Sequence, residues 1–119
     1  MSADTSPGAV GELHAGVIGS LCRFAHAMAR EKGFWDKPRN DGEAIALMHS
    51  ELSEALEALR HGNPPSEHIP EFSGLEEELA DELIRIFDFC GGNRLRLGEA
   101  VIAKMKFNAG RGFRHGKHF

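Results

Sequence analysis

Apolar residues recur every three or four positions along most of the chain, which is the spacing of one face of an α-helix. Within residues 9–32 these positions are Val10, Leu13, Val17, Leu21, Phe24 and Met28. The pattern predicts three further helices, from about residue 40 to 60, from 73 to 90 and from 94 to 109. No stretch alternates apolar and polar residues as a strand would. We therefore expect an all-α chain of four helices that packs as a bundle.

Capping residues set the expected helix boundaries. Asn40 and Ser73 are each followed three residues later by a glutamate, as in a capping box, so each is expected to begin a helix. Gly91 and Gly92 are expected to end the third helix. Residues 1–8 are small and polar and are expected to form a flexible tail before a single domain at 9–119.

Composition narrows the class of protein. The chain has 119 residues, of which 41% are hydrophobic and 27% charged, as in ordinary globular domains. Its apolar runs are too short to span a bilayer, and MSADTSPG does not resemble a secretory signal. Cys22 and Cys90 do not form a metal-binding or redox pair, so we expect free core thiols and a cytoplasmic location.

The formal net charge of −4 hides a strong asymmetry. Residues 43–88 hold twelve of the eighteen acidic residues and two arginines, whereas residues 91–119 hold seven basic residues and one acid. Folding these segments together places an acidic surface beside a basic one. Two interpretations stay open: surface salt bridges, or a site that needs a cation on one side and an anion on the other.

Two pairs of carboxylates lie in the acidic segment, Glu51 with Glu54 and Glu78 with Asp81. Residues three apart share one face of a helix, so two packed helices can bring four carboxylates together. Each like-charged pair at about 4 Å costs about 4 kcal/mol, so such a group needs a cation. Oxygen ligands favour Mg²⁺, with Mn²⁺ as the alternative.

The helical wheel leaves this interpretation open. The predicted core stripe of the second helix is Met48, Leu52, Ala55, Leu56 and Leu59, and that of the third helix is Leu75, Leu79, Leu83 and Ile86. Glu51 borders its stripe, Glu54 lies further round, and Asp81 lies nearly opposite. The acidic face is therefore either solvated or covered by another subunit or a ligand. On the third helix we also expect Asp88 to form an ion pair with Arg85.

The arrangement of these motifs resembles that of the MazG-like, all-α nucleoside triphosphate pyrophosphohydrolases. ELSE at 51–54, a gap of twenty-three residues and ELAD at 78–81 match the family pattern ExxE followed by ExxD. EKGFWD at 31–36 and KMKFNAGRGFRHGKHF at 104–119 are also similar to family segments, and the resemblance covers about residues 13–119. Gly112 departs from the pattern, which has proline after the arginine.

The resemblance implies an activity and a set of site residues. The family hydrolyses a nucleoside triphosphate, here a dNTP or a non-standard NTP, to the monophosphate and pyrophosphate. The residues that would hold Mg²⁺ are Glu51, Glu54, Glu78 and Asp81, with Glu54 as the catalytic base. The residues that would contact phosphate are Lys104, Asn108 and Arg111. Phe34 and Trp35 would bound a pocket for the base, or else form a hydrophobic plug. A homodimer or homotetramer is implied as well.

The sequence is also compatible with two other function classes. One is a non-catalytic helical module that binds a nucleotide or a protein partner, which the small core of a single chain favours. The other is nucleic-acid binding through the basic C-terminal segment, which the net charge of −4 and the lack of interleaved aromatic residues disfavour.

Overall fold

The computed structural model describes residues 6–117 and contains four α-helices in that range. They are α1 (Pro7–Glu31), α2 (Asp41–Arg60), α3 (Gly74–Gly92) and α4 (Leu97–Ala109), followed by one 3-10 turn, η1 (Phe113–Gly116). Among the described residues the β-structure is limited to an isolated bridge between Pro65 and Ser73. The predicted all-α class is confirmed.

Side chains cap the first three helices. The Ser6 hydroxyl accepts from the Ala9 N–H, so α1 begins at Pro7, two residues before the predicted start. The Asn40 side chain accepts from the backbone N–H of Glu43 at 2.9 Å. Ser73 forms the predicted capping box with the glutamate three residues later. The rest of the predicted tail, residues 1–5, lies outside the described residues.

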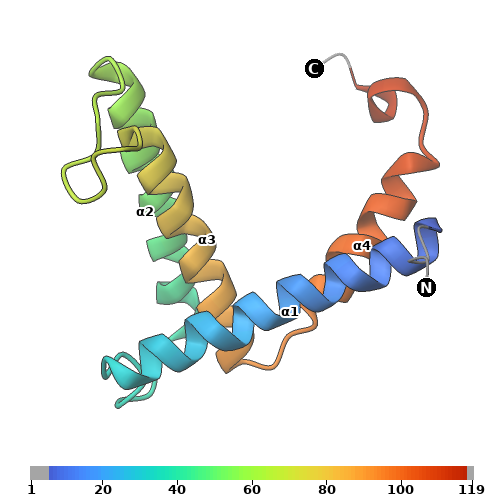
Figure 1. Ribbon diagram of the computed structural model, residues 1–119, viewed down its shortest axis with the longest axis horizontal. Helices are drawn as coiled ribbons and strands as arrows, with labels where there is room; N and C mark the ends of the chain where they lie inside the picture. Colours follow the sequence, from blue (N-terminus) through green and yellow to red (C-terminus); the bar gives the residue numbers. More distant parts are fainter. Residues whose placement is uncertain (1–5, 118–119) are drawn as a thin grey trace.

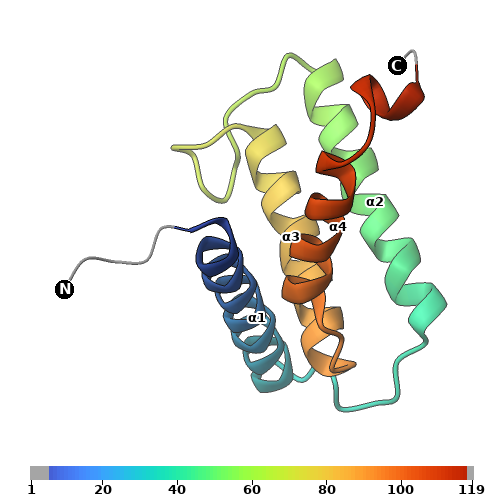
Figure 2. The same ribbon diagram turned by 90° about the vertical axis from the view of Figure 1, so that its right-hand side faces the viewer.

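The helices form two arms that rise from α1 (Figure 1). α3 packs against the C-terminal half of α1 and carries α2 beside it, whereas α4 packs against the N-terminal half of α1. Figure 2 looks at the same arrangement from the side of α4. The α2–α3 arm and the α4 arm diverge, so the four helices do not close into a bundle within one chain.

Glycines allow the helices of this frame to approach closely. A Cβ at Gly91 would meet the carbonyl oxygen of Cys22, and one at Gly98 would meet the carbonyl of Ala15. A Cβ at Gly92 would meet the Trp35 ring. Gly91 and Gly92 are the last two residues of α3, as predicted, and they also lie where α3 crosses α1.

The predicted core stripes are buried only in part: Met48 and Ala55 of the α2 stripe are buried, whereas the leucines are not. The buried face of α2 consists of Ala44, Met48, Glu51 and Ala55. Leu52, Leu56 and Leu59 are about half exposed, and so are Leu79 and Leu83 on α3. The wheel prediction assumed that the largest apolar side chains face the partner helix. Instead, α2 buries two alanines, Met48 and Glu51, and both helices leave these leucines about half exposed.

No helix within residues 6–117 combines the length and the apolar character needed to cross a membrane. Cys22 and Cys90 are buried free thiols, as predicted.

Candidate functional site

Carboxylates converge where α2 lies against α3. Glu51 and Glu54 stand one turn apart on α2, and Glu78 lies opposite them on α3. One oxygen of each of these three side chains lies within 4.8 Å of the others. Glu51 is 7% exposed, Glu78 is partly buried and Glu54 is exposed. We call these three residues the acidic cluster.

The acidic cluster is incompletely neutralised by its own chain. The Nε–H of Arg85 donates to Oε1 of Glu51 at 2.7 Å. The other oxygen of Glu51 and Oε2 of Glu78 are buried and have no hydrogen-bond partner. Burial, followed by the neighbouring Glu54 and Glu51, raises the pKa of Glu78 to about 7. The cluster therefore holds a proton near neutral pH, in the place that a cation would take.

The donor set of the acidic cluster fits a divalent cation. Hard divalent ions prefer carboxylate oxygens, and a buried oxygen without a donor is costly unless something compensates it. Glu51 meets this description, because its side chain is more than nine-tenths buried and its unpaired oxygen lies among the other carboxylates. The cluster can therefore bind a metal ion.

Asp81, the fourth predicted ligand, lies outside this group of three. It stands one turn beyond Glu78 on α3 and is partly buried. Burial and then the negative charge of Glu51 raise its pKa, whereas the nearby Arg85 lowers it. Asp81 thus lies within the field of the acidic cluster without joining it.

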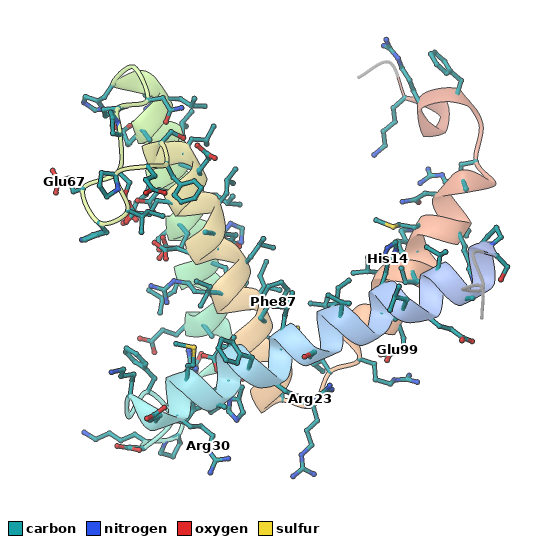
Figure 3. The ribbon with its side chains drawn as sticks, viewed as in Figure 1. His14, Arg23, Arg30, Glu67, Phe87 and Glu99 are labelled. Atoms are coloured by element: carbon teal, nitrogen blue, oxygen red, sulfur yellow. The ribbon has the colours of Figure 1, made fainter. Side chains whose placement is uncertain are left out.

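The predicted phosphate contacts lie on the other arm. Lys104 and Asn108 belong to α4, and Arg111 follows it. The Lys104 ammonium lies 4.6 Å from the Phe107 ring centroid, and the Arg111 guanidinium 5.8 Å from it. Figure 3 labels Glu67 on the loop at the far end of the α2–α3 arm and Glu99 near the start of α4. Lys104 and Arg111 therefore lie together around Phe107 on the α4 arm, whereas the acidic cluster lies on the α2–α3 arm.

Asp88 is the centre of a buried polar network that fixes the loop before α2. Its Oδ1 accepts from the Trp35 indole N–H at 2.8 Å and lies 3.1 Å from Nδ1 of His26. Its Oδ2 accepts from Arg39 at 2.9 Å, and the Arg39 guanidinium stacks 4.4 Å from the Trp35 ring centroid. The predicted pair of Asp88 with Arg85 was wrong, because Arg85 donates to Glu51 instead, and Asp88 faces the loop before α2.

Phe34 and Trp35 have different environments. Phe34 is 69% exposed, whereas Trp35 is half-buried in the Asp88 network. A cavity of about 240 Å³ lies beside Phe34, and Leu47 of α2 is part of its wall. Leu47 stands one helical turn before Glu51, so this hollow continues the face that carries the acidic cluster.

Sequence reasoning missed Arg85 as the partner of Glu51, and it missed His26 and Arg39 as partners of Asp88. The contact of His26 with Asp88 spans 62 residues, and helical spacing carries no information about such a pair. For Arg85 a clue was present, because it lies seven residues, or two turns, after Glu78 on the same face of α3.

Comparison of the chain with protein-family models, with curated proteins and with solved structures found no match.

Proposed function

We propose that the protein is a Mg²⁺-dependent hydrolase that converts a nucleoside triphosphate to the monophosphate and pyrophosphate. The observation that carries this proposal is the acidic cluster, with its buried unpaired oxygens on Glu51 and Glu78. The resemblance of the ExxE and ExxD motifs to the MazG-like family supports the same activity. The preferred substrate is a dNTP or a non-standard NTP, and Mn²⁺ is the alternative ion.

The three carboxylates of the acidic cluster have different roles in this proposal. Bound Mg²⁺ would neutralise the triphosphate and polarise the phosphoryl group that is attacked. Glu51 is fixed by Arg85 and buried, so it would hold the ion and would not act on the substrate directly. Glu54 is the exposed member and can take the proton from the attacking water. Glu78 would release its proton to solvent when an ion binds.

The remaining predicted residues complete the proposed site. Lys104, Asn108 and Arg111 would stabilise the negative charge that moves to the departing pyrophosphate. Phe34 is exposed beside the cavity next to Leu47 and would contact the base. Trp35 would act mainly by holding this loop in place, since its indole N–H is already bonded to Asp88. The proposed compartment is the cytoplasm, where buried free thiols stay reduced.

We also propose that the chain assembles as a homodimer or homotetramer. The radius of gyration is 17.3 Å, whereas a compact chain of this length has about 13.5 Å. Leu13, Val17, Leu21, Phe24 and Met28 are 41–65% exposed on α1. This stripe lies about 150° around the helix from the side that contacts α3 and α4. Apolar surface of this extent is typical of an interface.

The decisive experiment is a nucleotide panel with and without Mg²⁺, scored for monophosphate and pyrophosphate. Glu54→Gln is expected to lower turnover by about 100-fold or more, as for loss of a general base. Glu57→Gln is the matched control, because Glu57 lies on the same helix but pairs with Arg60 at the surface. Full activity of Glu54→Gln would refute the assignment.

The exposed apolar surface supports a second candidate, a non-catalytic helical module that binds a nucleotide or a protein partner. It predicts that nucleotides raise the thermal midpoint without any turnover in the same panel. Release of pyrophosphate that depends on Glu54 would exclude it.

A further inference from the structure

The loop that joins α2 to α3, residues 61–73, is closed at its base by its own backbone. The N–H of Gly74 donates to the carbonyl oxygen of Pro64 at 2.8 Å, and the N–H of Ser66 donates to that of Phe72 at 2.8 Å. Both bonds join backbone groups, which do not titrate, so the base of the loop is held in the same way at every pH at which the chain is folded.

Glu77 of α3 holds the tip of this loop through both of its carboxylate oxygens. Oε2 accepts from the hydroxyl of Ser66, which is 4% exposed. The same hydroxyl oxygen accepts from the backbone N–H groups of His68 and Ile69 at 3.2 and 3.1 Å. Oε1 of Glu77 accepts from Nδ1 of His68, whose side chain is 84% exposed. The tip, residues 66–69, is therefore joined to α3 by one buried bond and one exposed bond.

The exposed bond is the one whose charge changes near neutral pH. A carboxylate oxygen only accepts hydrogen bonds, so Nδ1 of His68 carries a proton in both the neutral and the charged ring. The charged groups around this ring are acidic: Glu77 and Asp81 of α3, and Glu67 of the loop, which Figure 3 labels. The hydrogen bond to Glu77, followed by its negative charge, raises the pKa of His68 above the ordinary value of 6.5. Deprotonation of His68 therefore removes an ion pair and leaves a weaker neutral bond.

We propose that Ser66, His68 and Glu77 form a pH-sensitive clamp on the loop between α2 and α3, closed more firmly while His68 is charged and opening more often once it is neutral. The contribution of the ion pair is fully present below pH 6.5 and is lost as the pH rises through the raised pKa of His68. The buried bond of Ser66 persists, so the change is local opening of the tip and not unfolding of the arm. This inference does not depend on the proposed hydrolase activity.

Hydrogen exchange of two backbone amides measures the opening of the clamp directly. The N–H groups of His68 and Ile69 both donate to the Ser66 hydroxyl, so they exchange when the tip leaves α3. Division by the intrinsic exchange rate at each pH gives a protection factor. Both protection factors should fall by about 2- to 5-fold between about pH 5.5 and 8.5, the range for the loss of an exposed ion pair. Protection factors that do not change with pH would overturn the proposal.

Two histidine variants identify the group responsible. His68→Gln keeps a donor for Glu77 without a charge that titrates, so its protection factors should be independent of pH and close to the alkaline values of the wild type. His61→Gln is the matched control, because His61 is an exposed histidine whose ring bonds the backbone of Glu57 at the end of α2. It should keep the wild-type pH profile. A profile that survives in His68→Gln, or vanishes in His61→Gln, would overturn the proposal.

NMR titration of the His68 ring tests the ion pair without hydrogen exchange. The wild type should show a pKa above 6.5, and Glu77→Gln should lower it towards the ordinary value. Ser66→Ala removes the buried bond but keeps the ion pair, so it should lower protection at every pH and retain the pH dependence. A pKa of His68 that is the same in the wild type and in Glu77→Gln would overturn the proposal, because the ring would then not be paired with that carboxylate.

Discussion

Glu78→Gln tests whether the like charges of the acidic cluster destabilise the folded chain until a cation neutralises them. Without divalent ions, burial and the neighbouring Glu54 and Glu51 raise the pKa of Glu78 from 4.5 to about 7. The folded state therefore binds this proton more tightly than the unfolded state does. Between pH 4.5 and 7 the folded chain carries more protons, so its free energy of unfolding falls as the pH rises through this window. Above pH 7 the loss is complete.

The size of the effect follows from the same pKa. One pKa unit corresponds to about 1.4 kcal/mol, and solvent at the edge of the site screens part of it, which leaves about 1–2 kcal/mol at pH 8. Glu78→Gln removes this penalty. In EDTA the variant should be more stable than the wild type by about 1–2 kcal/mol at pH 8 and nearly equal to it at pH 4.5.

Urea unfolding at fixed protein concentration measures this difference. With an m-value of about 2 kcal/mol per M, the urea midpoint at pH 8 should rise by roughly 0.5–1 M in the variant. Mg²⁺ at ten times its Kd should stabilise the wild type by about 1.4 kcal/mol and the variant by less, which narrows or reverses the order. Glu71→Gln, an exposed acid in the loop before α3, is the control. A pH-independent difference between Glu78→Gln and the wild type would refute the reasoning.

Three further predictions concern the frame around the site. Asp88→Ala leaves the partly buried Trp35 N–H and Arg39 guanidinium without their acceptor and removes the contact with His26, so we expect a loss of about 3 kcal/mol in urea unfolding and a red shift of the single tryptophan's emission; an unchanged spectrum would contradict this. Gly98→Val forces α4 off the Ala15 carbonyl and should cost at least about 2 kcal/mol, whereas Gly16→Ala, in open space on α1, should gain about 0.5–1 kcal/mol; equal effects would argue against the close crossing. Leu56→Arg, at a half-exposed position, should lower the mass measured by light scattering, and an unchanged assembly would place the interface elsewhere.

Local signals in the sequence predicted the helices well. The caps at Asn40 and Ser73 begin α2 and α3 because a side-chain oxygen satisfies a free N–H at each start. Gly91 and Gly92 end α3 as predicted, but they also permit a close crossing of helices. Helical spacing did not predict this second role, because the contact of Gly91 with Cys22 spans 69 residues of the chain.

The site was predictable in part. Spacing of three residues placed Glu51 and Glu54 on one face, and their approach to Glu78 followed once α2 and α3 paired. Which face of α2 is buried could not be predicted from hydrophobicity, because Glu51 is buried there while Leu52, Leu56 and Leu59 stay half exposed. Nor did the sequence show that Lys104 and the acidic cluster lie on different arms, since helical spacing carries no information about contacts between helices.

Crystals grown with Mn²⁺ in place of Mg²⁺ test the central claim most directly, since the anomalous signal of manganese locates the ion itself. The account predicts a peak between the carboxylates of Glu51, Glu54 and Glu78, with oxygens at about 2.2 Å, as is usual for small divalent ions. Crystals grown in saturating Mn²⁺ that show no anomalous peak at these three residues would contradict it.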